Sequence, residues 1–199
     1  MDNYLSISVS FDRSRKRAVF VGSFYSSMDP MRHYITLEYD GNAFYFIPTG
    51  QDSTGHPFTF GITGYDSNIN RIVFYGAQQY GSPAETWEYD GCIWRQIQSA
   101  NTPSIEWKFI GLTEVQEIGG LVVVSESDSG NTTWVYSIGQ WHRVSLGDQI
   151  SNRLAGLMSF DYSRHALEFY GGLDLQTGDW LDQIWELQCV QHCKPISRP

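Results

Sequence analysis

The chain has 199 residues, of which 41% are hydrophobic and 15% aromatic, while charged residues make up only 18%. This length suits the core of one domain, and the abundance of aromatic residues and glycine predicts strands joined by tight turns. The net charge of -9 argues against nucleic acid as a partner, because that binding relies on Lys and Arg to neutralise phosphates.

The sequence shows no sign of a membrane segment. No apolar run approaches the ~20 residues that cross a bilayer, and residues 1–8 lack the basic and apolar segments of a secretory leader. We therefore expect a soluble protein without a membrane partner, in the cytoplasm or in a larger soluble assembly. Three cysteines are too few for a disulfide framework, so packing must hold the fold together.

In chain order, three kinds of predicted strand recur. The first is apolar with small residues and in its clear copies ends in an aromatic residue and Asp, with copies at 7–12, 62–66, 157–161 and, more weakly, 112–114. The second is rich in β-branched and aromatic residues, with copies at 18–22, 72–76, 121–125 and 167–171. The third begins as Thr36-Leu37-Glu38-Tyr39-Asp40-Gly41, with copies at 86–91, 133–136 and 184–187.

The third strand carries an anchor residue that sets the period. The anchors are Leu37, Trp87, Trp134 and Trp185, at intervals of 50, 47 and 51 residues. Seven residues beyond each anchor stand Phe44, Trp94, Trp141 and His192. This spacing predicts a fourth strand after a short Asp-Gly or Ile-Gly turn. Each repeat is thus predicted to be a four-stranded antiparallel meander, with the period of one propeller blade.

Each unit resembles the kelch repeat. It has a hydrophobic strand ending in glycine, then a variable loop, then an aromatic-x-Tyr-Asp segment and Trp. The resemblance covers four copies, at approximately 4–49, 58–99, 107–146 and 154–196. It implies a single all-β domain over 1–199, a kelch-like β-propeller with four blades of four antiparallel strands. The four blades either close a small ring or form an open arc that another chain completes, because an open array leaves apolar blade faces uncovered.

In such a meander the connections alternate between two sides of the blade. The connections between strands one and two and between strands three and four are short. The other connections are long, at 23–34, 48–57, 77–85, 98–108, 147–153 and 172–182. Because long loops on a rigid scaffold commonly form binding surfaces, we expect function on this long-loop face.

The long-loop face is predicted to be acidic, with large aromatic side chains among its polar residues. The candidate binding residues are Tyr25, Tyr80, Trp107, Trp180, Asp128, Asp174 and Asp179. Exposed rings would suit a protein interface or stack on sugars, and the carboxylates could select a basic partner. Ordinary solvated loops, with aromatic side chains folded back onto their blades, are the alternative interpretation.

The segment Cys189-Val190-Gln191-His192-Cys193 offers two thiols and an imidazole. Its spacing does not match that of paired zinc-ligand elements, so we interpret it as a divergent last strand and leave a local disulfide open. The other histidines are scattered, and no nucleophile, phosphate-loop or calcium-loop motif is present. We therefore predict no catalytic residue, metal or cofactor.

The sequence favours a non-catalytic protein-interaction or structural scaffold that presents its acidic loop face to a partner protein or to a second copy. The alternative is a carbohydrate-binding or sugar-active protein of kelch fold, with a glycan as ligand. No catalytic residues of kelch-fold enzymes carry over to this sequence.

Overall fold

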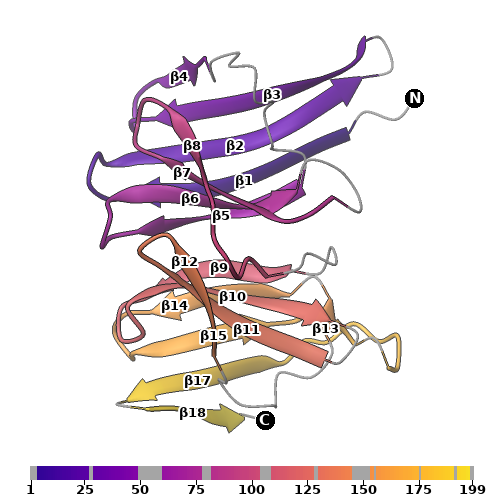
Figure 1. Ribbon diagram of the computed structural model, residues 1–199. Helices are drawn as coiled ribbons and strands as arrows, with labels where there is room; N and C mark the ends of the chain where they lie inside the picture. The colour runs from indigo at the N-terminus through magenta and orange to yellow at the C-terminus, as the bar shows by residue number, and fades with distance from the viewer. Residues whose placement is uncertain are drawn as a thin grey trace. The chain divides into compact units, whose positions relative to one another are not determined.

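The structure is a computed structural model that describes residues 4–26, 29–48, 60–77, 82–103, 109–127, 130–144, 153–154, 156–174, 176–190 and 192–197 (Figure 1). These residues form strands and turns and include no helix. Within them, no helix is long and apolar enough to cross a membrane. The chain divides into two compact units, Met1–Gln98 and Ser99–Pro199.

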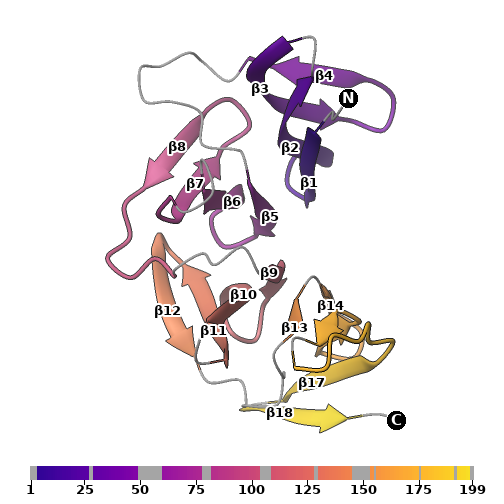
Figure 2. The same cartoon turned by 90° about the vertical axis from the view of Figure 1, so that its right-hand side faces the viewer.

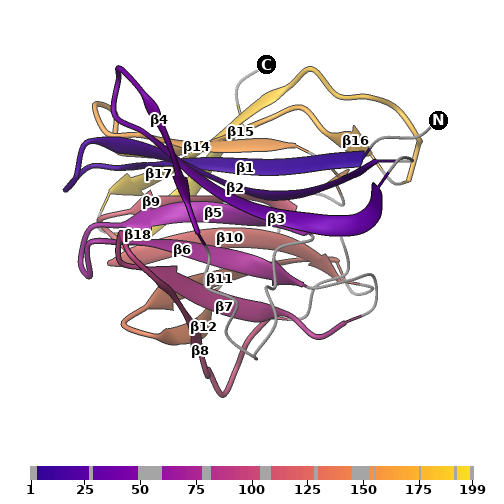
Figure 3. The ribbon, with the colours of Figure 1, turned by 90° about the horizontal axis from the view of Figure 1, so that it is seen from above.

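Unit 1 contains two antiparallel sheets whose strands pair in chain order. Blade 1 consists of β1 (Tyr4–Asp12), β2 (Arg17–Ser26), β3 (Asp29–Tyr39) and β4 (Phe44–Ile47). Blade 2 consists of β5 (Phe60–Asp66), β6 (Arg71–Ala77), β7 (Glu85–Tyr89) and β8 (Trp94–Ile97). Figure 3 shows β1, β2 and β3 of blade 1 running alongside one another.

Unit 2 repeats this arrangement with one addition. Blade 3 consists of β9 (Phe109–Val115), β10 (Gly120–Ser127), β11 (Gly130–Ser137) and β12 (Gln140–Val144). Blade 4 consists of β14 (Leu157–Asp161), β15 (Ala166–Tyr170), β17 (Ile184–Val190) and β18 (His192–Ser197). The short strands β13 (Arg153–Leu154) and β16 (Leu173–Asp174) form a separate antiparallel pair.

These four sheets confirm the predicted fold class, an all-β propeller with four blades of four antiparallel strands. Each blade has two faces, because successive side chains of a strand point to opposite sides of its sheet. We call the face that carries the anchor residue face A and the opposite face B. The closure of the four blades into a ring and the single domain over 1–199 stay predictions.

In unit 1, face B of blade 1 packs on face A of blade 2. Val19 and Val21 of blade 1 are at most 1% exposed and share a core cluster with Ile72, Phe74 and Tyr89 of blade 2. The innermost strands β1 and β5 lie beside each other, as Figure 2 shows. Small polar residues join them, since the backbone N–H of Thr63 donates to the Ser8 hydroxyl over 2.8 Å.

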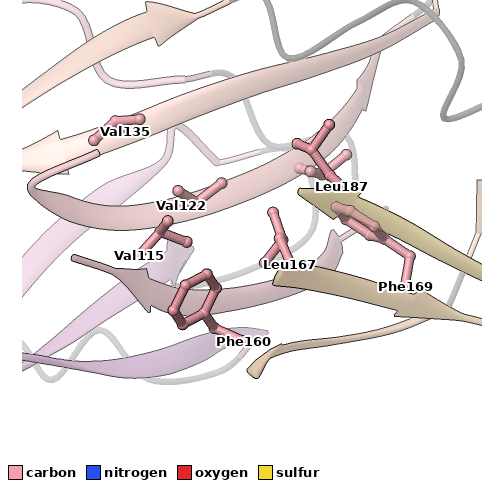
Figure 4. Packing of buried hydrophobic residues seen from close by; sticks show 8 residues of the cluster. Val115, Val122, Val135, Phe160, Leu167, Phe169 and Leu187 are labelled. Carbon is pink, nitrogen blue, oxygen red and sulfur yellow. The ribbon is translucent and has the colours of Figure 1, made fainter. Parts of the chain in front are cut away.

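In unit 2, the same faces meet. Val122 and Val135 on face B of blade 3 pack against Phe160, Leu167 and Phe169 on face A of blade 4. Figure 4 shows these side chains filling the space between the two sheets. The interior is closely packed, because a Cβ added to Gly111 would lie 2.8 Å from the Cβ of Met158. One packing rule, face B on the next face A, therefore builds the core of each unit.

The turn between the first two strands of every blade contains one residue in the left-handed region. These residues are Lys16 (φ 55°), Asn70 (φ 52°), Gly119 (φ 81°) and His165 (φ 51°), at equivalent positions of the four repeats. Between β11 and β12, Ile138 and Gly139 both have positive φ, which is typical of a two-residue hairpin turn. The predicted short Ile-Gly turn is confirmed there.

Two details of the sequence interpretation are wrong. Residues 23–34 do not form a long loop, because β2 and β3 extend to a Ser26–Asp29 pair and Phe24 stacks on His33 at 4.9 Å between ring centroids. His192 also does not take the position of Trp94 and Trp141, because β17 continues to Val190 before the chain turns. Pro195 instead stands opposite Leu187.

Candidate functional site

Residues 171–183, between β15 and β17, belong to the predicted long-loop face and form what we call the Trp180 hairpin. Its backbone is closed by the hydrogen bonds Gly171 N to Gln183 O (3.1 Å), Leu181 N to Gly172 O (2.8 Å) and Asp174 N to Asp179 O (2.9 Å). Leu173 also pairs with Trp180 as a β-bridge, and β16 pairs with β13. The hairpin is therefore a structured platform.

Asp174 builds the tip of this hairpin. Its carboxylate accepts hydrogen bonds from the backbone N–H of Gln176 at 2.7 Å and of Thr177 at 3.3 Å. Gly178, with φ +77°, reverses the chain and donates to the Asp174 carbonyl at 2.8 Å. Short polar side chains that bond to nearby backbone in this way define tight turns. Asp174 therefore shapes the site through the turn.

Trp180 stands on this platform with 74% of its surface exposed. The alternative in which this ring folds back onto its blade is therefore wrong for Trp180. Asp179 and Asp182, one on either side of it in the chain, are exposed as well. The hairpin thus combines one large amphipathic ring with neighbouring negative charge, and it carries three of the candidate residues, Trp180, Asp174 and Asp179.

The other candidate residues are less fully defined. Tyr25 lies within β2, where its backbone pairs with Tyr4 and so belongs to a strand. Its side chain, together with Tyr80, Trp107 and Asp128, lies outside the described part of the chain. The backbone places Cys189 opposite Cys193 across β17 and β18, and their side chains are likewise outside that description.

A buried ionic network, which the sequence interpretation missed, lies at the β1–β2 turn of blade 1. The Arg15 guanidinium donates to Asp12 Oδ2 at 2.7 Å and also to Glu38 Oε1. Tyr89 of blade 2 donates its hydroxyl to the same Glu38 oxygen at 2.9 Å. The Asp12 and Glu38 side chains are 1% and 5% exposed. The network therefore ties the turn of one blade to the third strand of the next.

The surroundings of the network set the ionisation of its members. Burial raises the pKa of Asp12, but hydrogen bonds from the Ser14 hydroxyl and from Arg15 outweigh burial, so the Asp12 pKa is lowered. Burial, helped by the Glu38 carboxylate, raises the pKa of the Tyr89 phenol well above its ordinary value. Asp12 stays charged and Tyr89 stays a neutral donor, as the network requires.

Blades 2 and 4 carry versions of the same turn. In blade 4, Arg164 pairs with Asp161 at 2.6 Å and with Glu186 at 3.0 Å. In blade 2, Ile69 replaces the arginine. Asp66 is fully buried, accepts hydrogen bonds from Asn68 and from the Ile69 backbone, and has no hydrogen-bond partner at its Oδ2. Burial therefore raises the pKa of Asp66 despite the hydrogen bonds from Asn68 and Ile69.

Donors of their own turns bind these carboxylates, except at Oδ2 of Asp66. In the described residues, no group of three or more His, Cys, Asp or Glu side chains could hold a metal ion. The clusters at Asp12 and Asp161 are best understood as parts that stabilise the repeat, and Asp66 accepts hydrogen bonds within the equivalent turn of blade 2. The chemistry open to an external ligand is that of an exposed aromatic ring with nearby carboxylates.

The structure also shows an exposed apolar surface that the sequence interpretation missed. On face A of blade 1, Ile7, Val9 and Phe11 of β1 are 44%, 50% and 54% exposed, and Phe44 and Phe46 of β4 are each 62% exposed. The alternation of apolar residues with serine along β1 is the signal that could have identified this face.

Comparison of the chain with known protein families and with curated proteins finds no match. What the protein does must therefore be inferred from its own residues.

Proposed function

We propose that the chain is a kelch-like, non-catalytic interaction scaffold that binds a partner protein through the Trp180 hairpin. The exposure of Trp180, 74% on a hydrogen-bonded hairpin, is the observation that carries this proposal. Tryptophan is enriched among the residues that dominate binding energy at protein interfaces. Presentation on an ordered hairpin lowers the entropy that binding must overcome. The proposal places the scaffold in the cytoplasm or in a larger soluble assembly.

Charge indicates the kind of partner. Asp179 and Asp182 flank Trp180, and the whole chain carries a net charge of -9. A basic surface would be attracted by this field, and its arginine or lysine side chains could also stack on the indole ring. We therefore propose a partner segment rich in Lys or Arg.

The experiment is a peptide array that includes Lys- and Arg-rich sequences, probed with the full chain and followed by titration of the strongest peptide. Trp180→Ala should weaken that binding by about tenfold or more, because a central aromatic anchor contributes about 2 kcal/mol or more. The control is Ile93→Ala, which removes another exposed apolar side chain, 50% exposed, from a short turn of blade 2.

Both variants should keep the thermal stability of the wild type, because both side chains are largely exposed. Binding that falls equally in Trp180→Ala and Ile93→Ala would refute the hairpin as the site. Binding that does not weaken with added salt would refute the charge argument.

The exposed ring also favours one alternative. Trp180 could stack on a sugar while Asp179 accepts hydrogen bonds from hydroxyl groups, which would make the chain a carbohydrate-binding protein. A glycan array distinguishes the two. A glycan whose binding is lost in Trp180→Ala, with no peptide bound, would replace the protein-partner proposal.

A further inference from the structure

The Trp180 hairpin, which lies wholly in unit 2, has an open strand edge. Leu173 and Trp180 stand opposite each other, and the hydrogen bonds that hold this pair join the residues on either side of it, at 2.8 and 2.9 Å. In an antiparallel pair of this kind, the two central residues direct their own N–H and C=O groups away from each other. The backbone groups of Trp180 therefore point out of the hairpin.

These outward groups have no partner in the part of the chain that the structure describes. Among the described residues, no backbone hydrogen bond joins the N–H or C=O of Trp180, or those of Asp182. Backbone groups of residues two apart in an extended segment face the same edge. Leu181 between them donates inward to Gly172 instead. Because Trp180 and Asp182 are both exposed, segment 180–182 offers donors and acceptors with the spacing of a strand edge.

The rest of the same edge already carries a strand. The strands of blade 4 follow the order β14-β15-β17-β18, so β18 covers the side of β17 that faces away from β15. It pairs with β17 from Val190 to Trp185. Segment 180–182 precedes β17 on that side, whereas the other outer side of the hairpin is covered where β13 pairs with β16. An added strand at 180–182 would thus extend the sheet of blade 4 beside β18.

We infer that an extended, Lys- or Arg-rich segment of a partner protein adds to residues 180–182 as a β-strand. The inference rests on the proposed function and specifies the conformation of the bound segment. Main-chain hydrogen bonds to Trp180 and Asp182 supply affinity, and alternate side chains of the added segment supply selectivity. A basic side chain opposite Asp182 meets its carboxylate, and one opposite Trp180 lies against the indole ring.

The charge of this edge argues against a second copy of the chain as the added strand. Two copies paired edge to edge would bring exposed Asp179 and Asp182 of one chain close to those of the other. Like charges opposed across a strand pair destabilise it, and charged side chains commonly protect an edge against self-pairing. A basic segment has the complementary charge, and the net charge of -9 on the whole chain attracts it further.

The test uses the Lys- or Arg-rich peptide that binds most strongly in the array. Two versions of it carry N-methyl groups on alternate amides, one in each register, so that both keep the same length, charge and side chains. Only one register of amides in a strand faces a given edge. One version should bind about tenfold or more weakly than the unmethylated peptide, because it loses backbone hydrogen bonds, and the other within about threefold of it.

Amide hydrogen exchange of the full chain, followed by NMR, gives a second readout. In the free chain, the Trp180 and Asp182 amides should exchange fast, whereas the Leu181 amide, which donates to the Gly172 carbonyl, should exchange slowly. Bound peptide should slow exchange at Trp180 and Asp182 by about tenfold or more and change it little at Leu181. Ile93→Ala should respond to the peptide as the wild type does.

The outcomes separate this inference from the proposed function. If Trp180→Ala weakens peptide binding while the two N-methylated versions bind alike, the hairpin is the site but no strand is added. Slow exchange at Trp180 in the free chain would also overturn the inference, because the edge would then already be paired. If no basic peptide binds, the proposed function fails and the inference falls with it.

Discussion

Asp12 and Asp66 occupy the same position in two repeats, yet replacing each by asparagine should have opposite effects on stability. Asp12 accepts from the Ser14 hydroxyl at 2.7 Å and from the Arg15 Nε at 2.7 Å. Asp66 is just as buried, but it has no arginine and one of its oxygens lacks a partner. The pair therefore separates the effect of burial from that of ion pairing within one turn geometry.

The magnitudes follow from these contacts. Asp12→Asn places an amide N–H against a guanidinium N–H and leaves Arg15 with less negative charge nearby. The loss of a charge-assisted hydrogen bond of this kind costs about 2 kcal/mol. For a chain of this length, that lowers the midpoint of thermal unfolding by roughly 4 to 8 °C.

Asp66→Asn keeps an oxygen that can accept from the Asn68 N–H, now 2.9 Å from Asp66 Oδ1, and removes a buried charge. The free energy of unfolding at pH 7 should stay the same or rise by up to about 1 kcal/mol.

The dependence of stability on pH provides a second, independent test of the difference between Asp12 and Asp66. The pKa of Asp12 is lowered by folding, so its stabilisation is present above the unfolded pKa and is lost as pH falls through the folded pKa. The pKa of Asp66 is raised, so its charge destabilises the fold increasingly as pH rises from the unfolded pKa through the folded pKa. The advantage of Asp66→Asn over the wild type should therefore grow as pH rises across that interval.

Thermal unfolding followed by circular dichroism, in buffers from acid to neutral pH, measures both effects. Equal destabilisation by Asp12→Asn and Asp66→Asn at pH 7 would refute the reasoning, because the arginine would then make no difference. A stability difference between Asp66→Asn and wild type that does not change with pH would refute the assigned burial effect.

Three further predictions concern the turns and the network. Lys16→Gly should raise the free energy of unfolding by about 1 kcal/mol, whereas Lys16→Ala should not, because φ is 55° at this position and only glycine adopts it without strain. Gly41→Ala should lower the free energy of unfolding by about 1 kcal/mol, because φ is 96° at this position. Gly91→Ala should lower it by roughly 1 kcal/mol more than Gly41→Ala does, because a Cβ at Gly91 would lie 2.7 Å from the Arg15 guanidinium. Glu38→Gln should cost about 2 kcal/mol, since Arg15 and Tyr89 both donate to that carboxylate. Chemical denaturation of each variant beside the wild type measures these changes, and a neutral Glu38→Gln would show that the network does not stabilise the fold.

The four blades could be predicted because their signals are local. The segments around Leu37 and Trp87 differ by few residues, and each lies on a third strand followed by a short turn. The turns are specified locally as well. The Asp90 carboxylate accepts hydrogen bonds from the backbone N–H groups of Cys92 and Ile93, so adjacent residues determine this turn.

Strand ends were predicted less well because they depend on cross-strand partners. The region 23–34 contains polar and turn-forming residues, and these favoured a loop. The stacking of Phe24 on His33 instead continues the β2–β3 ladder. In the last blade, the extension of β17 to Val190 changed which residue faces Leu187. Neither contact has a signature in spacing alone.

The sequence identified part of the candidate site, and residues that depend on long-range contacts were missed. Trp180 and its acidic neighbours could be identified, because a large ring among polar loop residues stands out in any sequence. The role of Arg15 was not predicted. Its contacts with Glu38 and, through Glu38, with Tyr89 join residues far apart in sequence, and only the packing of one blade on the next brings them together.

Exposure of a blade face depends on position in the array as much as on sequence. From the repeat alone, Phe11 and Val9 are core residues, because their equivalents Tyr65 and Thr63 are 8% and 6% exposed. In the first blade, Phe11 and Val9 are instead 54% and 50% exposed. A terminal repeat in a stable array normally carries a polar outer face, and blade 1 carries Phe44 and Phe46 at 62% exposure instead.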